Sequence, residues 1–256
     1  MQKIIIDTDG NLEALKALKK ILKEYEKETV AITCSASALS VEEAVSNVLH
    51  ILKETERDIP VYHGQKGPMI KAPAEKRLDS HELYNSEIIR TDTERSAIDV
   101  LIESSEDLEI ISMGPLSNIA MALIKNTDAM LKVKRIYILG GMVFHGDVGP
   151  MSEFNIYHDA VAADRIMKSG IPLTLLPIEV GSYEERIEFV LHPEKITKQY
   201  DCYARVELNG EYTYGASIND VRDRNRKEFV SQNNVMYPFN SILILDNAKE
   251  EITMEA

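Results

Sequence analysis

Short apolar runs alternate along the chain with longer amphipathic segments. Residues 3–7 read Lys-Ile-Ile-Ile-Asp and predict a strand that is buried on both faces. Residues 11–28 then repeat leucine and isoleucine every three or four positions, which predicts a helix with one apolar face. The β-branched run 29–35 predicts a second strand, and Ser40 with Glu43 has the spacing of a helix-capping box.

The same order of strand and helix continues through the chain. Because strands that are separated by helices usually pair in parallel, the pattern predicts an α/β fold with a mostly parallel sheet flanked by helices. Further strands are expected at 59–64, 107–114, 133–141, 171–180 and 241–247, and further helices at 115–126 and 158–170.

Two regions interrupt this order. Residues 65–93 contain glycine, proline and many charges, which predicts a long loop of the kind that covers a binding site. Residues 201–219 alternate around Asn209-Gly210, which predicts a C-terminal β-hairpin. No segment repeats another, so residues 1–256 are expected to form a single α/β domain.

Composition narrows the class of function. The formal net charge is −13 and the sequence pI is about 5.0, so the clustered Lys and Arg of a nucleic-acid surface are missing. Cys34 and Cys202 are too few and too far apart for a disulfide framework or a zinc site. No apolar run approaches the ~20 residues that span a bilayer, and no secretory signal opens the chain. We therefore expect a cytoplasmic protein that binds neither nucleic acid nor membrane.

Polar side chains gather where the predicted strands end. Ligands of parallel sheets bind at the carboxyl ends of the strands, and Asp7, Asp9 and Glu13 follow the first strand. Such acids suit a hydroxyl-rich or metal-bound ligand, whereas the glycine-rich patterns of phosphate sites are missing. The other candidates at strand ends are Asn118, His145, Asp147, Glu153 and Asn155.

The residues alone leave three interpretations of Asp9 and Glu13 open. They are carboxylates at a helix start, stabilised by the helix dipole. They are ligands of a hard cation such as Ca²⁺ or Mg²⁺, which prefers oxygen donors. Or they accept hydrogen bonds from sugar hydroxyls.

The segments SMGPLSNIAMAL (112–123) and ILGGMVFHGDVGPMSEFNIYHDAVAADRI (138–166) resemble the inosine-uridine preferring nucleoside hydrolase family. The opening IIIDTDG, the run IPLTLLPIEV (171–180) and the late VELNGEYTYGASINDVR are also similar to segments of that family. The resemblance covers most of residues 1–250, in order. It implies a nucleoside hydrolase-like fold and hydrolysis of the N-glycosidic bond between a ribose and a base. It also implies a homo-oligomer.

The resemblance implies a role for each matching residue. Asp9 falls on a calcium ligand, Asp7 on the acid two positions before it, and Ser117 on a residue whose backbone carbonyl binds calcium. Glu13 falls on an aspartate that takes part in proton transfer and ribose binding. The family uses the bound Ca²⁺ to activate water and to hold the ribose diol. The residues implied to hold ribose hydroxyls are Glu153 and Asn155.

Several departures from the family pattern weaken the implied calcium site. Ala14 stands at a direct calcium ligand, and Ala38 and Asp147 stand where the family has sugar-binding asparagines. The family's late helical region with its His-Asp pair, whose aspartate is a further ligand, has no counterpart here. Because the number of carboxylates sets calcium affinity, we expect Ca²⁺ to be held weakly or not at all.

The sequence also gives predictions for three histidines. We expect His145 to protonate the leaving base, and His81 in the 65–93 loop to face the pocket. His158 is expected to cap the helix that follows it.

The favoured function is an N-glycosidase that acts on a ribonucleoside or a related N-ribosyl compound, with Asp9, Glu13 and His145 as the catalytic residues. The alternative is an inactive homologue that binds a ribosyl ligand or a protein partner.

Overall fold

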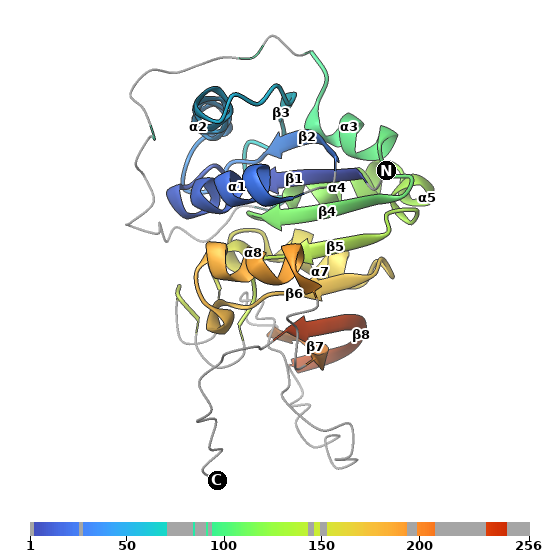
Figure 1. Cartoon of the computed structure of the whole chain (residues 1–256). Helices are drawn as coiled ribbons and strands as arrows, with labels where there is room; N and C mark the ends of the chain where they lie inside the picture. Colours follow the sequence, from blue (N-terminus) through green and yellow to red (C-terminus); the bar gives the residue numbers. More distant parts are fainter. Residues whose placement is uncertain are drawn as a thin grey trace.

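The computed structural model describes residues 3–25, 28–70, 84, 91, 94–142, 146–148 and 153–193, together with the backbone of 199–207 and 234–244. Its centre is one sheet with the strand order β3-β2-β1-β4-β5-β6-β8-β7 (Figure 1). Every neighbouring pair is parallel except β7–β8, which is antiparallel. The strands are β1 (Lys3–Thr8), β2 (Glu28–Cys34), β3 (Val61–His63), β4 (Leu108–Met113), β5 (Arg135–Ile138), β6 (Leu173–Leu175), β7 (Gln199–Glu207) and β8 (Asn234–Ile244).

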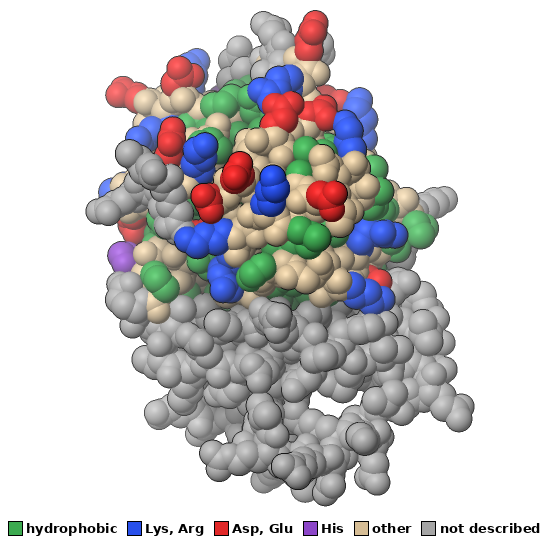
Figure 2. All heavy atoms as spheres, turned by 90° about the vertical axis from the view of Figure 1, so that its right-hand side faces the viewer, with side chains coloured by type: hydrophobic (Ala, Val, Ile, Leu, Met, Phe, Trp, Pro, Cys, Tyr) green, Lys and Arg blue, Asp and Glu red, His purple; other side chains and the backbone are tan. Residues whose placement is uncertain are grey.

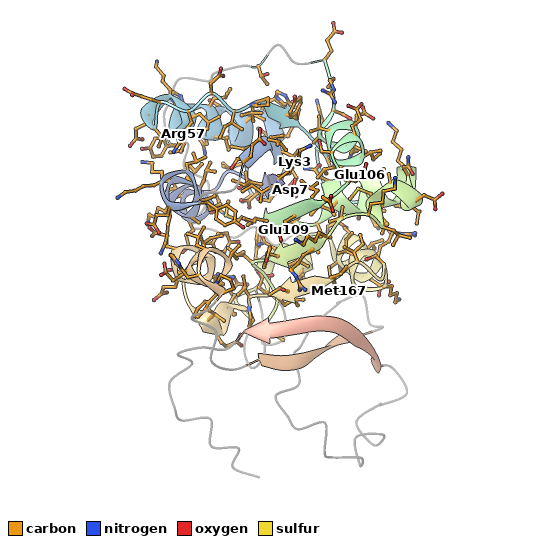
Figure 3. All side chains as sticks on the ribbon, turned by 45° about the vertical axis from the view of Figure 1, so that its right-hand side comes forward. Lys3, Asp7, Arg57, Glu106, Glu109 and Met167 are labelled. Carbon is orange, nitrogen blue, oxygen red and sulfur yellow. The ribbon has the colours of Figure 1, made fainter. Side chains whose placement is uncertain are left out.

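Helices cover both faces of the sheet. In Figures 1 and 3, α1, α2 and α8 lie on one face, and α3, α4, α5 and α7 lie on the other. This arrangement confirms the predicted α/β fold with helices flanking a parallel sheet. The helices are α1 (Leu12–Glu24), α2 (Val41–Glu54), α3 (Ala97–Glu103), α4 (Ser117–Lys125), α5 (Thr127–Met130), α6 (Phe154–His158), α7 (Ala160–Met167) and α8 (Tyr183–Leu191), with a 3₁₀ turn at η1 (Ile178–Val180).

The hydrophobic core lies between the sheet and these helices. Ile4, Ile5 and Ile6 of β1 are fully buried because this central strand has helices on both faces. Leu18 and Ile21 turn the apolar face of α1 into the same core, as the spacing predicted. Each Å² of apolar surface that is removed from water stabilises the fold by about 25 cal/mol. This core therefore stabilises the sheet and helices that carry the loops at the strand ends.

Local signals in the sequence explain where the helices begin. The predicted capping box of α2 is present, since Ser40 accepts a hydrogen bond from the Glu43 amide and Glu43 accepts one from the Ser40 amide. Asn11 caps α1 by accepting a hydrogen bond from the Ala14 amide at 2.9 Å. This helix ends at Glu24 rather than at residue 28.

The predicted helix 158–170 is wrong in its bounds. A short helix, α6, precedes it, and His158 is the last residue of α6. Asp159 caps α7 instead, because its Oδ1 accepts a hydrogen bond from the Ala162 amide at 3.0 Å. The expectation that His158 acts as the cap is therefore also wrong. A carboxylate is the better cap because an ordinary imidazole offers fewer acceptor sites.

The strand predicted at 171–180 is shorter in the structure. Only β6 lies within this range, and it is followed by the 3₁₀ turn η1. Helices α3 and α8 lie in segments for which no element was predicted. The strand β7 pairs with β8, and Asn209-Gly210, the predicted turn, lies outside the described residues. Most of the 65–93 loop lies outside them too.

The end of the molecule where the strands begin has no single-sign patch in its described part. Figure 2 shows Lys and Arg side chains interspersed there with Asp and Glu. Such a mixed surface is typical of solvent-exposed protein and offers no basic stripe for nucleic acid. Within the described residues, every helix is too short or too polar to cross a bilayer.

Candidate functional site at the carboxyl ends of the strands

Asp7 is the last acidic residue within β1 and is fully buried in the interior of the fold (Figure 3). Its Oδ1 accepts hydrogen bonds from Thr33 Oγ1 at 2.6 Å and from Asn118 Nδ2 at 2.8 Å. Its Oδ2 is buried and has no hydrogen-bond partner among the described residues. Burial raises the pKa of Asp7 to about 7, against the opposing effect of the Asn118 and Thr33 hydrogen bonds. A buried carboxyl with one free oxygen holds a proton readily.

Asp9 lies just beyond β1, and it too is fully buried. Its Oδ2 accepts hydrogen bonds from Ser37 Oγ at 2.6 Å and from Asn11 Nδ2 at 3.1 Å, while its Oδ1 accepts one from the Asn11 amide at 3.2 Å. Burial is the largest influence on Asp9 and raises its pKa. Both oxygens of Asp9 are therefore bonded to the protein's own donors.

The turn between β1 and α1 depends on glycine. Gly10 has a φ of 66°, a left-handed conformation that side chains rarely adopt. A Cβ added there would come within 2.6 Å of the Ala44 Cα, so α2 packs directly on this turn. Asn47 of α2 also donates a hydrogen bond to the Gly10 carbonyl at 2.9 Å. This close packing fixes the direction in which Asp9 leaves the strand.

Glu153 forms the second part of the site and caps α6. Its carboxylate accepts hydrogen bonds from the amides of Gly141 at 3.0 Å and of Asn155 and Ile156, each at 3.1 Å. Burial and, to a lesser extent, the nearby charge of Asp147 together raise the pKa of Glu153 to about 7. Glu153 is consequently a carboxyl group that is poised to exchange a proton near neutral pH.

Asn155 is the second residue of α6 and is 1% exposed. Its Nδ2 donates hydrogen bonds to the Leu139 carbonyl at 3.1 Å and to Tyr183 Oη at 2.6 Å. Its Oδ1 is buried, and no described residue donates a hydrogen bond to it. Burial raises the pKa of Tyr183, and so do the charges of Asp9 and Glu153. Tyr183 therefore connects the two acidic parts of the site.

A cavity of about 340 Å³ opens beside Glu153. Its lining combines exposed acids at the rim, Glu13 and Asp147, with the buried Glu153 and the first turn of α8. Asp147 is held in place because its Oδ1 accepts a hydrogen bond from the Phe154 amide at 2.8 Å. The full lining is Glu13, Asp147, Glu153, Ile178, Gly181, Ser182, Tyr183 and Arg186.

Asn118 and Ser117 are not among the residues that line this cavity. Asn118 bonds to Asp7, and its Oδ1 accepts a hydrogen bond from the Gln65 amide at 2.7 Å, so it connects the ends of β1, β3 and β4. Ser117 Oγ donates a hydrogen bond to Asp159 at 2.6 Å. His81 and His145, predicted to face the ligand, lie outside the described residues.

Three residues near the site were missed in the sequence. Tyr183 and Arg186 lie on α8, for which no helix was predicted. His158 was treated only as a cap, yet its buried Nε2 has no partner among the described residues. Burial lowers the pKa of His158, while the charges of Asp159 and Asp9 raise it. The Ser182-x-x-Glu185 capping box was the signal that would have located α8.

Comparison with known proteins identifies the family. The family model described as inosine-uridine preferring nucleoside hydrolase matches residues 4–188. The chain belongs to this family. It is 34% identical over 191 residues to an uncharacterized protein of Schizosaccharomyces pombe, covering 70% of this chain and 61% of that protein. It is 25% identical over 271 residues to the non-specific ribonucleoside hydrolase RihC of Salmonella paratyphi A, covering 86% of this chain and 89% of RihC.

Solved structures of nucleoside hydrolases share the fold. The purine-preferring ribonucleoside hydrolase from Gardnerella vaginalis superposes with a TM-score of 0.77 at 20% sequence identity, over 95% of this chain and 93% of that chain. This chain is thus a nucleoside hydrolase-like protein with a distant relationship to the solved structures.

Members of this family bind a metal ion, and the residues around Asp9 fit calcium poorly. Asp9 already accepts three hydrogen bonds from the protein. Position 14, next to Glu13, is a fully buried alanine that offers no oxygen. Asp7 and Asp9 supply two carboxylates, whereas Ca²⁺ takes 6–8 oxygen ligands.

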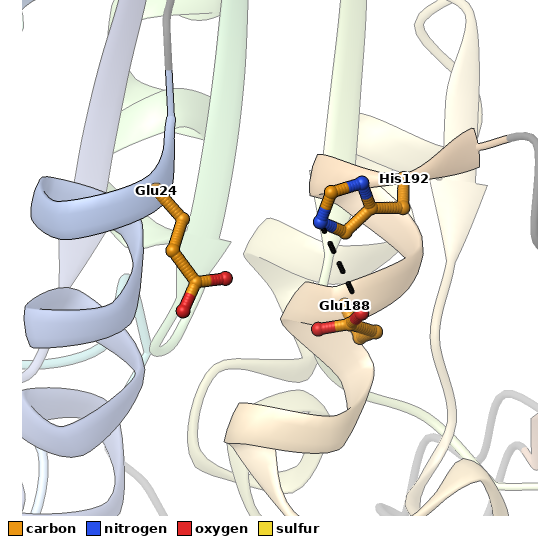
Figure 4. Close-up of side chains that lie close together, drawn as sticks. All are labelled: Glu24, Glu188 and His192. Atoms are coloured by element: carbon orange, nitrogen blue, oxygen red, sulfur yellow. Dashed lines mark ion pairs between the residues drawn. The ribbon is translucent and has the colours of Figure 1, made fainter.

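Among the described residues, the group whose ligand atoms converge well enough to hold a metal lies elsewhere. It consists of Glu24, Glu188 and His192, with ligand atoms within 4.8 Å of one another (Figure 4). Glu24 ends α1 and His192 follows α8, so the group lies at the opposite end of these helices from Glu13 and Ser182. Lys20 already forms an ion pair with Glu188. This group has no part in the cavity.

Proposed function

We propose that the protein is an N-glycosidase that hydrolyses a ribonucleoside or a related N-ribosyl compound to base and ribose. The observation that supports it most is the cavity of about 340 Å³ in which Glu13, Asp147 and Glu153 converge. The sugar of such a substrate gains oxocarbenium-like positive charge as the bond to the base breaks. Carboxylates around the ring stabilise that charge.

Each acid has a separate role in this proposal. Glu13 lies at the rim, where water has access, and it takes the proton from the attacking water. Glu153 is held rigidly by three backbone amides, and it orients the sugar by accepting hydrogen bonds from its hydroxyls. Asn155, with its unpartnered Oδ1, accepts from a neighbouring hydroxyl. Asp147 adds negative charge at the rim. The charge of Asp9, which also acts on Tyr183, adds to the negative electrostatic potential of the site.

The other assignments from the sequence stay within the proposal. His145 protonates the leaving base, and His81 and Asn118 belong to the substrate side of the site. If calcium binds, Asp7, Asp9 and the Ser117 carbonyl hold it weakly, and the ion would polarise water and the ribose diol. We also propose one domain over residues 1–256, a homo-oligomer and a cytoplasmic location.

A second function has support from one observation. The carboxylate oxygens of Asp9 are bonded to Ser37 and Asn11, which leaves little capacity for a catalytic metal. A homologue with such a site would bind a ribosyl ligand, or a protein partner, without turnover. The polar cavity would then serve recognition alone.

An assay for free base and reducing sugar separates the two functions. We expect slow release from at least one nucleoside in a panel, with little change when Ca²⁺ is added or removed. Glu13→Gln should lower the rate at least 100-fold, because general-base catalysis contributes about 10²–10⁴-fold. Glu24→Gln is the matched control, since it makes the same change at the other end of α1. Ligand-induced thermal stabilisation without release from any nucleoside would establish the binding function instead.

A further inference from the structure

Arg186 is a buried cation whose bonding is incomplete. Its side chain lies in the second turn of α8 and the residue is 4% exposed. Nη1 donates a long hydrogen bond of 3.4 Å to the Leu176 carbonyl, and Nε has no hydrogen-bond partner in the part of the chain that the structure describes. The guanidinium lies over the Tyr183 ring, 4.5 Å from its centroid. A buried cation usually needs a carboxylate partner, because the transfer of a charged group from water into the protein interior is unfavourable.

No carboxylate among the described residues forms an ion pair with this guanidinium. Glu153 lines the same cavity as Arg186, and the positive charge of Arg186 lowers the pKa of Glu153 against the larger, raising effect of burial. The cavity thus separates a buried cation from a buried carboxyl group. A ligand group that both donates and accepts hydrogen bonds would satisfy both of them.

We propose that Arg186 is a substrate-binding residue which, together with Glu153, holds one hydroxyl of the ribosyl ligand. The guanidinium donates a hydrogen bond to the hydroxyl oxygen, and the hydroxyl donates to the Glu153 carboxylate. The inference rests on the proposed ribosyl ligand, and it adds a determinant of specificity on α8. A hydroxyl is preferred over an anionic group because Glu13 and Asp147 stand on the same cavity wall and would repel an anion.

The test is a binding cycle that needs no turnover. Calorimetry or ligand-observed NMR would compare D-ribose with its 2-deoxy, 3-deoxy and 5-deoxy analogues on the wild type and on Arg186→Gln. We expect Arg186→Gln to weaken D-ribose binding about tenfold, the usual size for a hydrogen bond to a charged group. One deoxy analogue should bind both proteins equally, because it lacks the hydroxyl that Arg186 contacts.

Two further variants keep the test decisive. Arg135→Gln is the matched control, since it makes the same change at a partly buried arginine that begins β5 at the far end of the strand, where it donates to Thr174 Oγ1 at 2.8 Å. It should leave all four affinities unchanged. Arg186→Lys keeps the charge and replaces Arg186→Gln should that variant not fold.

Several outcomes would overturn the inference. An equal loss for all four sugars would mean that Arg186 only supports the fold, and tighter binding of ribose 5-phosphate than of ribose would mean an anion subsite. A wild type that binds none of the sugars would also refute it. Base release is measured separately, so an enzyme can fail this test and an inert binding protein can pass it.

Discussion

At the scale of single residues, the sequence identified the chemical groups but not their partners. Asp7 and Asp9 stood out because carboxylates at the end of an apolar strand are unusual. Their hydrogen-bond donors, Thr33, Ser37 and Asn118, lie 26, 28 and 111 positions away, and only the folded sheet brings them together. Asn118 could be proposed as a ligand contact, but its bond to Asp7 depends on the pairing of β1 with β4.

The turn at Gly10 gives a prediction at this scale. Gly10→Ala should destabilise the protein by at least about 2 kcal/mol more than Gly170→Ala, measured by urea unfolding. Both glycines have positive φ, 66° and 83°, so both variants incur similar backbone strain. A Cβ at Gly170 meets nothing within 4 Å, whereas one at Gly10 meets the α2 backbone. Equal losses would show that α2 can move away from the turn.

At the scale of elements, the sequence predicted those with strong periodicity. The strands β1, β2 and β4 and the helices α1 and α2 were expected close to their observed positions, because their apolar spacing is regular. Helix α8 was missed since it is short and rich in charge, reading Tyr-Glu-Glu-Arg-Ile-Glu-Phe-Val-Leu. The cavity could not be derived from the sequence for the same reason, because α8 supplies Tyr183 and Arg186 to its wall.

The two capping boxes give a prediction for elements. Ser40 begins α2 and Ser182 begins α8, and each is exposed and pairs with a glutamate three residues later. Serine to alanine at either position should lower stability by about 1 kcal/mol. Only Ser182→Ala should also weaken ribosyl binding, because the first turn of α8 lines the cavity. A Ser40→Ala variant with the same binding loss would contradict this assignment.

At the scale of the whole molecule, folding encloses acids within an already acidic protein. The net charge is −13, and among the described residues Asp7, Asp9 and Glu153 are buried without an ion-pair partner. Burial raises the pKa of each of them, to about 7 for Asp7 and Glu153. The folded state therefore binds more protons than the unfolded state between about pH 4 and 7.

This linkage predicts how stability changes with pH in metal-free buffer. The contribution of a carboxyl with a raised pKa is complete below its unfolded value, near 4, and is lost as the pH rises through about 7. Raising the pH through both pKa values of Asp7 should lower the free energy of unfolding by roughly 4 kcal/mol. Asp7→Asn should remove this part of the decrease in unfolding free energy with pH, and the variant should be more stable than the wild type at pH 8. The exposed Asp58→Asn is the control and should leave the slope unchanged.

The central place of β1 in the sheet has a consequence for synthesis. Along the chain, β1 comes before both of its neighbours in the sheet: β2 follows soon after, whereas β4 on its other side begins only at Leu108. Until then, one backbone edge of Ile4, Ile5 and Ile6 has no pairing partner. An unpaired apolar edge attracts other chains, so the nascent protein is most exposed to aggregation after β1 has been made and before β4 has been made. Chaperone protection would matter most in that interval.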